Sequence, residues 1–276
     1  MGKALKRLYG SYDIPKEINQ LIELEEDLQK VDLSLAMIGL IPIVEFHPYS
    51  ITPPDLIPFA ETGGDGIHLG FLTDFGLVSD LMDAPIVCVS PTNDPPIRYI
   101  ARNFKEFMNL ALAVPYVEML EGFWAIQDEK NISEAMKEFV NETPVDWVTM
   151  RAHIYNRLKQ SFSTEQVNIF HYFHQIKLER AEQIAMQTLD GLGIMGQSNG
   201  SSYSFAANRN CDELELERMA HYLNAANLVE KLAFVRDAHY WCILAPDYDE
   251  AVSNIIIKLL ESLDLTDEVN RVVGEM

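Results

Sequence analysis

Basic residues are scarce in this sequence. Its 276 residues include 21 Lys and Arg against 42 Asp and Glu, which gives a formal net charge of −21. A phosphate backbone is bound by surfaces rich in Lys and Arg, and anionic lipids attract the same residues. The composition therefore argues against a nucleic-acid partner and against a membrane partner. An acidic surface favours solubility or a basic partner.

Cysteines and long apolar runs are also few. Cys88, Cys211 and Cys242 are widely spaced and form no C-x-x-C pattern, so we expect reduced, buried thiols and neither a zinc knuckle nor a redox dithiol. The longest apolar stretch, Leu33 to Val44, is too short to span a bilayer. The N-terminus has no apolar segment of the secretory type. We expect a cytoplasmic protein.

The spacing of apolar residues predicts the architecture of the first part of the chain. Residues 15–31 carry apolar side chains at steps of three and four, which predicts a helix. Between residues 40 and 102, five short apolar or alternating runs are separated by Pro, Gly, Asp and Asn. These runs predict a small, mostly antiparallel sheet. Asn103, three residues before Glu106, predicts the cap of the next helix.

Beyond Pro115 the pattern is helical almost throughout, and we expect essentially no strand there. Helix starts are predicted at Asn131, Ser163 and Asp212, each followed by Glu or Gln three residues later. A last helix is predicted over residues 249–263, and a loop over residues 191–210. The fold class is therefore predicted as α+β. Residues 1–115 would form a small antiparallel sheet with flanking helices, and residues 116–276 a helical extension or second domain.

No combination of residues indicates a catalytic site, so we predict no catalytic residue, no metal and no cofactor. Gly191 to Gly196 match G-x-G-x-x-G, but a helix precedes them where the dinucleotide motif needs a strand. We interpret this match as a helix C-cap followed by a loop. His171 and His174 lack the adjacent Glu and the third ligand of a zinc helix. His68 alternates with apolar neighbours, and we expect it to face water.

Residues 52–114 carry the most informative pattern. An apolar run, Leu56 to Ala60, precedes the turn Thr62-Gly63-Gly64-Asp65-Gly66, and an alternating strand begins at Ile67. Glycines in such a turn supply positive φ, so Gly63, Gly64 and Gly66 are predicted to serve the fold. Two further apolar runs and a helix over residues 104–112 follow. This stretch resembles the SUKH superfamily, which includes glucan-synthesis-regulator-like proteins and bacterial toxin-immunity proteins.

The resemblance implies a non-enzymatic α+β module that binds a protein, as a toxin-neutralising immunity protein or a cell-wall-related regulator. An acidic surface suits a basic toxin, and we predict Glu61, Asp65 and Asp74 as partner-binding carboxylates. Residues 116–276 lie outside the resemblance. Two alternatives stay open: a regulatory scaffold that forms a homo-oligomer through its helical region, and an enzyme. The enzyme's site would lie between the sheet and the helical part, where Asp65, Asp74, Arg98 or His68 could meet.

Overall fold

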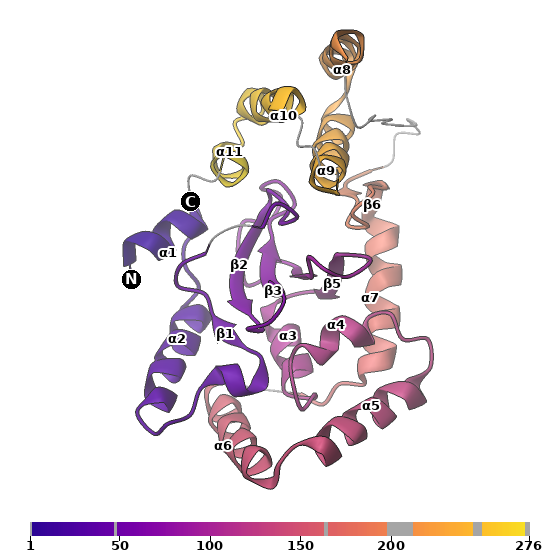
Figure 1. The fold of residues 1–276 in the computed structure, drawn as a ribbon. Coiled ribbons are helices and arrows are strands. Elements are labelled where there is room, and N and C mark those ends of the chain that lie inside the picture. The colour runs from indigo at the N-terminus through magenta and orange to yellow at the C-terminus, as the bar shows by residue number, and fades with distance from the viewer. Residues whose placement is uncertain (1, 47–48, 163–164, 198–211, 245–249, 274–276) are drawn as a thin grey trace.

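The computed structural model describes residues 2–46, 49–162, 165–197, 212–244 and 250–273, which form helices around one antiparallel sheet (Figure 1). The strands are β1 (Ile41–Pro42), β2 (Leu56–Glu61), β3 (His68–Leu72), β4 (Ile86–Val89), β5 (Ile97–Ala101), β6 (Ile184–Met186) and β7 (Ile194–Met195). The helices are α1 (Gly2–Tyr9), α2 (Lys16–Gln29), the 3-10 helix η1 (Leu35–Ile38), α3 (Phe104–Ala111), α4 (Met119–Phe123), α5 (Glu129–Glu142), α6 (Val145–Ser161), α7 (Ile169–Gln183), α8 (Glu213–Ala225), α9 (Leu228–Leu244), α10 (Glu250–Ser262) and α11 (Thr266–Val272). The α+β class is confirmed.

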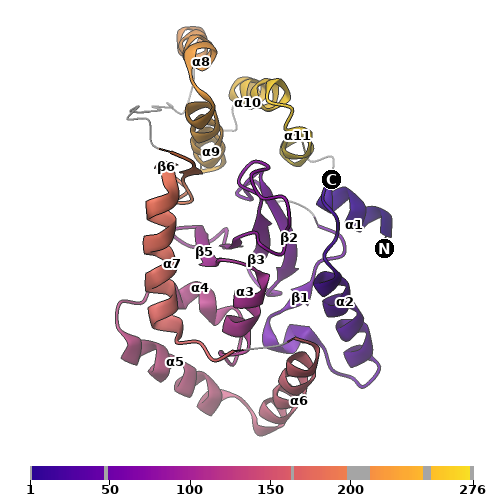
Figure 2. The ribbon, with the colours of Figure 1, turned by 180° about the vertical axis from the view of Figure 1, so that it is seen from behind.

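The main sheet follows the order of the chain. Its strands lie in the order β1-β2-β3-β4-β5, and every neighbouring pair is antiparallel. The antiparallel sheet predicted between residues 40 and 102 is therefore confirmed. Helix α7 runs alongside β5 in both Figure 1 and the reverse view of Figure 2.

Both faces of the sheet are buried. In β4, Ile86 and Cys88 pack into the larger hydrophobic core, whereas Val87 and Val89 pack into a smaller cluster on the opposite face. Leu192 and Tyr240 contact that smaller cluster. The C-terminal third of the chain therefore covers the face of the sheet that the N-terminal and middle helices leave open.

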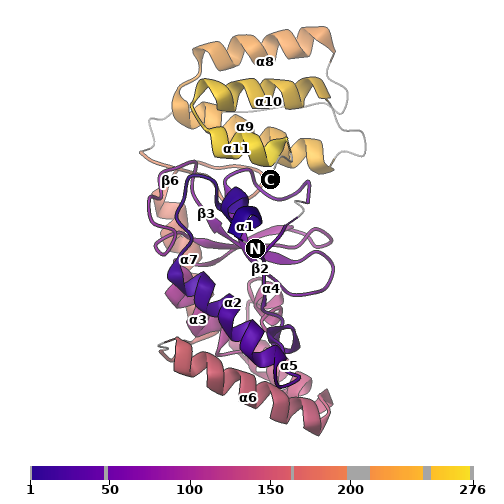
Figure 3. The ribbon, with the colours of Figure 1, turned by 90° about the vertical axis from the view of Figure 1, so that its left-hand side faces the viewer.

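The described apolar residues form two main cores, and along the chain the change from one to the other falls between Ile176 and Met186. Ile132 of α5, Ile154 of α6 and Phe173 of α7 are buried in the same core as the sheet. From Met186 onward, buried apolar residues form a second core. Helices α8 to α11, which supply most of it, stack together at one end of the molecule (Figure 3).

Helix starts follow local capping. The predicted caps at Asn103 and Asp212 are confirmed, since each side chain accepts a hydrogen bond from the backbone N–H three residues later. The start predicted at Asn131 is wrong: α5 begins at Glu129, because Asp128 accepts from the N–H of Lys130 at 2.9 Å. The start predicted at Ser163 lies outside the described residues.

A short ribbon replaces part of the loop predicted over residues 191–210. Strands β6 and β7 pair antiparallel, with Ile184 opposite Met195. Gly191 and Gly193, at φ +75° and +67°, lie in the turn between them. The expectation of essentially no strand after residue 115 is therefore wrong here, and so is the C-cap interpretation of the glycines. The rest of that predicted loop lies outside the described residues.

Candidate functional site

The three predicted partner-binding carboxylates lie in two different environments. Glu61, at the end of β2, and Asp65, in the turn after it, are exposed. Asp74 is only 5% exposed, so its prediction as a surface carboxylate is wrong. Arg180 of α7 explains its burial, because the guanidinium donates hydrogen bonds of 2.8 and 2.7 Å to the two carboxylate oxygens of Asp74.

The glycine turn has the predicted conformation at two of its three positions. Gly63 and Gly66 have φ of +92° and +71°, in the region that favours glycine. Gly64 does not have a positive φ, and Asp65, at φ 49°, takes the left-handed conformation instead. A Cβ on Gly63 would lie 2.9 Å from Cδ1 of Ile41, the end of a side chain that can shift, so the positive φ is the main reason for glycine here.

The four residues considered for an enzyme site do not converge. Asp65 is exposed at the turn, whereas Asp74 pairs with Arg180. Arg98 forms an ion pair with Glu121 of α4. His171 and His174 are exposed, and no group of three or more His, Cys, Asp or Glu among the described residues could hold a metal ion.

His68 is buried, so the expectation that it faces water is wrong. Its side chain is 1% exposed, and its ring nitrogens lie 3.1 Å from Oγ1 of Thr52 and 2.8 Å from the carbonyl oxygen of Gly66. The rings of Phe46 and Tyr49 lie within 5.1 and 5.6 Å. Burial lowers the pKa of His68 to about 4, which keeps the ring neutral at physiological pH.

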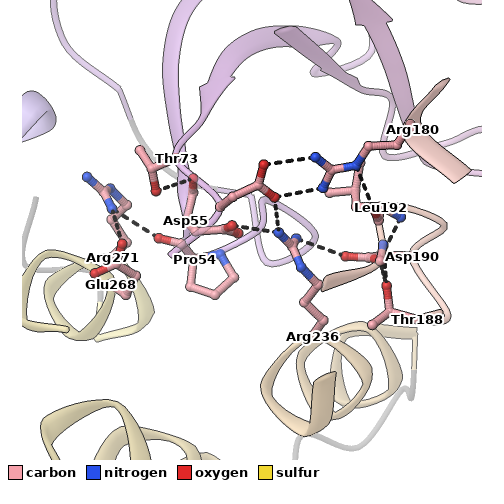
Figure 4. Close-up of polar contacts among 12 residues, drawn as sticks. Pro54, Asp55, Thr73, Arg180, Thr188, Asp190, Leu192, Arg236, Glu268 and Arg271 are labelled. Carbon is pink, nitrogen blue, oxygen red and sulfur yellow. Dashed lines mark hydrogen bonds and ion pairs between the residues drawn. The ribbon is translucent and has the colours of Figure 1, made fainter. Parts of the chain in front are cut away.

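Asp74 belongs to a buried ionic network that links segments far apart in the chain (Figure 4). Arg236 of α9 donates hydrogen bonds to Asp55 at 2.6 Å and to Asp190 at 3.2 Å, and it lies 3.5 Å from Asp74. Arg180 also donates to the carbonyl oxygen of Leu192. The guanidinium groups of Arg180 and Arg236 thus bind three carboxylates from different parts of the chain. These are Asp55 before β2, Asp74 after β3 and Asp190 in the β6–β7 turn.

The ionic network carries an excess negative charge inside the protein. Three carboxylates face two cations, and every member is at most 5% exposed. Burial raises the pKa of Asp55 to about 6, although the charge of Arg236 opposes the shift. Because every member is buried and paired within the protein, we assign the network to structure: it fixes the C-terminal helices on the end of the sheet.

The loop after β3 adds an apolar connection to the ionic one. Asp74 and Phe75 have left-handed φ of 47° and 55°, a strained conformation for residues other than glycine. Phe75 is the only described residue before Met186 that is buried in the second core. The guanidinium of Arg236 lies 4.9 Å from the centre of its ring.

A surface feature open to a partner lies on α6, at the end of the molecule opposite to α8–α11 (Figures 1 and 2). A cavity of about 350 Å³ lies between α6, the end of α5 and residues 112–115. Two of its apolar lining residues, Val140 (45%) and Val148 (39%), are exposed, and Val145 (81%), Trp147 (44%) and Met150 (38%) are exposed elsewhere on α6. Exposed apolar patches on soluble proteins mark interaction surfaces. We refer to this cavity and its apolar rim as the α6 groove.

Helix α6 has two apolar stripes: one is buried in the first core, and the other lies along the α6 groove. Ile154 and Leu158, four residues apart, are buried in the first core. Val148, Ala152 and Tyr155 follow one another at steps of four and three and line the α6 groove. The hydroxyl of Tyr155 donates to the carbonyl oxygen of Val114 at 2.8 Å, which fixes the opposite wall.

The charged side chains of the α6 groove are Arg151 and Lys159. Arg151 donates to the carbonyl oxygen of Met37 at 2.7 Å and to the hydroxyl of Thr143 at 3.2 Å. Its guanidinium also lies over three rings, Tyr116, Phe139 and Trp147, at 4.9 to 5.6 Å. Among the described residues, no carboxylate belongs to the lining of this cavity. An arginine has five N–H donors, so Arg151 keeps donors for an anionic partner while the rings hold it in place.

The residues of the α6 groove and of the ionic network are not among the predicted site residues, although the sequence contains signals for them. Along α6, Val148-x-x-x-Ala152-x-x-Tyr155 is a second apolar stripe beside Ile154 and Leu158. Together the two stripes give α6 more apolar surface than one contact with the core requires. Arg236 and Asp237 stand inside the apolar run LAFVRDAHYW. A charged residue there must be buried and paired, which points to an ionic network without identifying its partners.

In comparison with known proteins, no protein-family model and no curated protein matches this chain. The SUKH resemblance of residues 52–114 therefore rests on the sequence pattern alone and stays a prediction.

Proposed function

We propose that this protein is a non-enzymatic protein-binding module that docks an acidic, apolar segment of a protein partner in the α6 groove. One observation carries the proposal: large apolar side chains are exposed around a cavity whose charged lining residues are both cations. Those cations stand out on a chain of net charge −21.

The geometry of the groove favours an amphipathic helix or an extended segment as the occupant. Apolar side chains of the partner would cover Val148 and Ala152, as helix-in-groove recognition requires. A partner carboxylate would accept from the remaining N–H groups of Arg151. Because the three rings already hold that guanidinium, little side-chain entropy is lost on binding. Lys159, exposed at the other end of the cavity, would add a second, weaker charge contact.

The location of two perturbed ionisable groups, Asp55 and His68, supports the non-enzymatic part of the proposal. In an enzyme, such groups gather in an accessible cleft. Here Asp55 and His68 are buried within the protein and hold its segments together. The α6 groove instead offers apolar surface and cations, which are the features of a docking site.

A narrower proposal is that the module neutralises a basic toxin through Glu61 and Asp65. It is supported by the SUKH-like stretch, by the net charge of −21 and by the exposure of both carboxylates. The partner chemistry it requires is opposite to that of the α6 groove, so the two surfaces are tested separately.

A random 16-residue peptide library, displayed on phage and selected on the full-length protein, tests the groove. We expect enrichment of peptides that combine Leu, Ile, Phe or Trp with Asp or Glu. Their synthetic forms should bind Arg151→Glu and Lys159→Glu at least about tenfold more weakly. Lys137→Glu is the matched control, because Lys137 is exposed on α5 outside the groove lining. It carries the same change of charge and should bind normally.

Enrichment of basic peptides, or equal binding to all three variants, would contradict the proposal. Equilibrium sedimentation addresses the remaining occupant, a second copy of this chain. If the protein is a dimer that Arg151→Glu dissociates, the occupant of the α6 groove is a second copy of this chain and not a segment of another protein. Thermal melts of each variant separate loss of binding from loss of folding, and Lys159→Glu, on an exposed side chain, keeps the test decisive if Arg151→Glu unfolds.

A further inference from the structure

A second cavity lies beside β5, away from the α6 groove. It measures about 190 Å³ and is bounded by β5, the end of α4, the C-terminal half of α7 and the β6–β7 turn. Its apolar lining residues are Pro95, Ile97, Ala181, Ile184, Leu189 and Leu192. We refer to it as the β5 cavity.

Two of the charged groups in its wall are already paired within the protein. Arg180 donates to both oxygens of Asp74 and to the carbonyl oxygen of Leu192. Asp190 accepts from Arg236, from the hydroxyl of Thr188 and from the N–H of Leu192. It is the only carboxylate among the lining residues. These two groups form the floor of the cavity and belong to the ionic network.

Lys177 is a third charged group, and it has no carboxylate partner among the described residues. Its Nζ lies 3.7 Å from the centre of the Trp124 ring and donates to the carbonyl oxygen of Trp124. Partial burial lowers the pKa of Lys177. An ammonium group has three N–H donors, so this contact leaves donors for an acceptor inside the cavity.

Two other residues that line the same cavity, Trp124 and Tyr99, carry further donors. The indole Nε1 of Trp124 is buried and has no acceptor among the described residues. The hydroxyl of Tyr99 forms no hydrogen bond within the described part of the chain, and burial raises its pKa to about 12, so it keeps its proton. Buried polar groups in native proteins are nearly all paired. Unpaired donors in one small cavity therefore point to an acceptor that binds there.

We propose that the β5 cavity binds a small apolar monocarboxylate, with its carboxylate on Lys177 and its apolar body against Ile97, Ile184 and Leu192. An apolar cavity of about 150 Å³ suffices for benzene, so 190 Å³ suits an acid the size of benzoate. The wall of the cavity is mainly apolar, and Lys177 is its one cation without a carboxylate partner among the described residues. A phosphate therefore fits this wall less well than a monocarboxylate does. The inference is independent of partner docking in the α6 groove.

Amide NMR of the full-length, ¹⁵N-labelled protein tests the proposal, with sodium benzoate as the probe. The chain has three tryptophans, and Trp124→Phe assigns the indole N–H signal of Trp124. We expect benzoate to shift this signal saturably. Benzamide, the neutral analogue of similar shape, should bind about tenfold more weakly or worse. Lys177→Met should weaken benzoate binding by a similar factor, since a charge-assisted hydrogen bond is lost.

Lys105→Met is the matched control, because Lys105 is exposed and pairs with Glu165 on the surface. It should leave benzoate binding unchanged. The absence of a saturable shift, equal affinities for benzoate and benzamide, or unchanged binding by a folded Lys177→Met would each overturn the proposal. Competition by inorganic phosphate at the benzoate concentration would overturn the assignment to carboxylates.

Discussion

Replacing Arg236 by Met should destabilise the protein strongly, whereas replacing Asp55 by Asn should not. Both side chains belong to the same ion pair, and both are 0% exposed. Removing Arg236 leaves three buried carboxylates with the single cation of Arg180. Breaking a buried pair in this way costs about 3–5 kcal/mol, a large part of the about 5–15 kcal/mol that holds a typical domain folded.

Asp55→Asn changes the charge balance in the opposite direction. It removes the excess negative charge of the ionic network, and the amide oxygen can still accept from Arg236. The other oxygen of Asp55 has no hydrogen-bond partner among the described residues. Replacing this oxygen with the amide nitrogen of Asn therefore breaks no hydrogen bond that the described residues make. The cost at pH 7.5 should stay below about 1–2 kcal/mol, the value of one weakened hydrogen bond to a charged group.

The pH dependence of stability distinguishes the two variants further. Because burial raises the pKa of Asp55 from 3.8 to about 6, the folded protein binds more protons than the unfolded chain between these values. The contribution of Asp55 to stability therefore increases as pH falls from about 6 toward 4, by at most about 3 kcal/mol. Asp55→Asn should lose this increase, and Arg236→Met should recover part of its deficit at low pH.

Urea denaturation followed by circular dichroism at pH 7.5 and pH 5.0 measures these differences. Arg157→Met is the matched control, because Arg157 lies in a half-exposed pair with Asp27 at 3.5 Å, and its midpoint should stay close to that of the wild type. The reasoning is refuted if Asp55→Asn destabilises as much as Arg236→Met, or if Arg236→Met unfolds at the same urea concentration as Arg157→Met.

Three other outcomes are expected. Gly63→Val should lower the free energy of unfolding by about 1–3 kcal/mol, since φ is +92° and the side chain would meet Ile41. Gly64→Val should melt like the wild type, because the nearest atom to its Cβ is 3.9 Å away. Equal melting temperatures for the two variants would contradict this prediction. His68 should stay neutral down to about pH 5, because burial lowers its pKa to about 4; a carbon-13 titration of the ring that shows a midpoint near 6.5 would disagree. If the partner is a basic protein, reversing the charges of Glu61 and Asp65 together should slow association in low salt and leave melting unchanged, and an unaltered on-rate measured by surface plasmon resonance would remove them from the interface.

Most of the architecture could be predicted from local patterns. The five strands before residue 102 are apolar runs bounded by turn residues, and hairpin neighbours in such a chain pair with one another. Helix α3 begins where its cap predicts. The ribbon of β6 and β7 is not predictable in this way, because each strand is only two or three residues long. Such a strand is too short to show the alternation of apolar and polar residues that predicts a strand.

The sites were harder to predict because they depend on contacts between distant segments. Nothing in the sequence near Asp74 distinguishes an exposed turn carboxylate from a buried one; its partner Arg180 lies 106 residues away. The α6 groove has the same property, since Arg151 is held by groups from η1, α5 and the segment before α4. Exposure of an apolar stripe follows only when the packing of every other helix is known.

The distance in sequence between Asp55 and Arg236, 181 residues, has a consequence for biosynthesis. The first core is built from residues up to Ile176, so it can form while the rest of the chain is still being translated. Until α9 emerges, Asp55, Asp74 and Arg180 remain open to water. The α6 groove belongs to the part that is made first. We therefore expect ribosome-bound chains that end before Arg236 to bind the groove's peptides already, and binding only after release of the whole chain would exclude this order. A partner could then engage the nascent protein before the C-terminal helices dock.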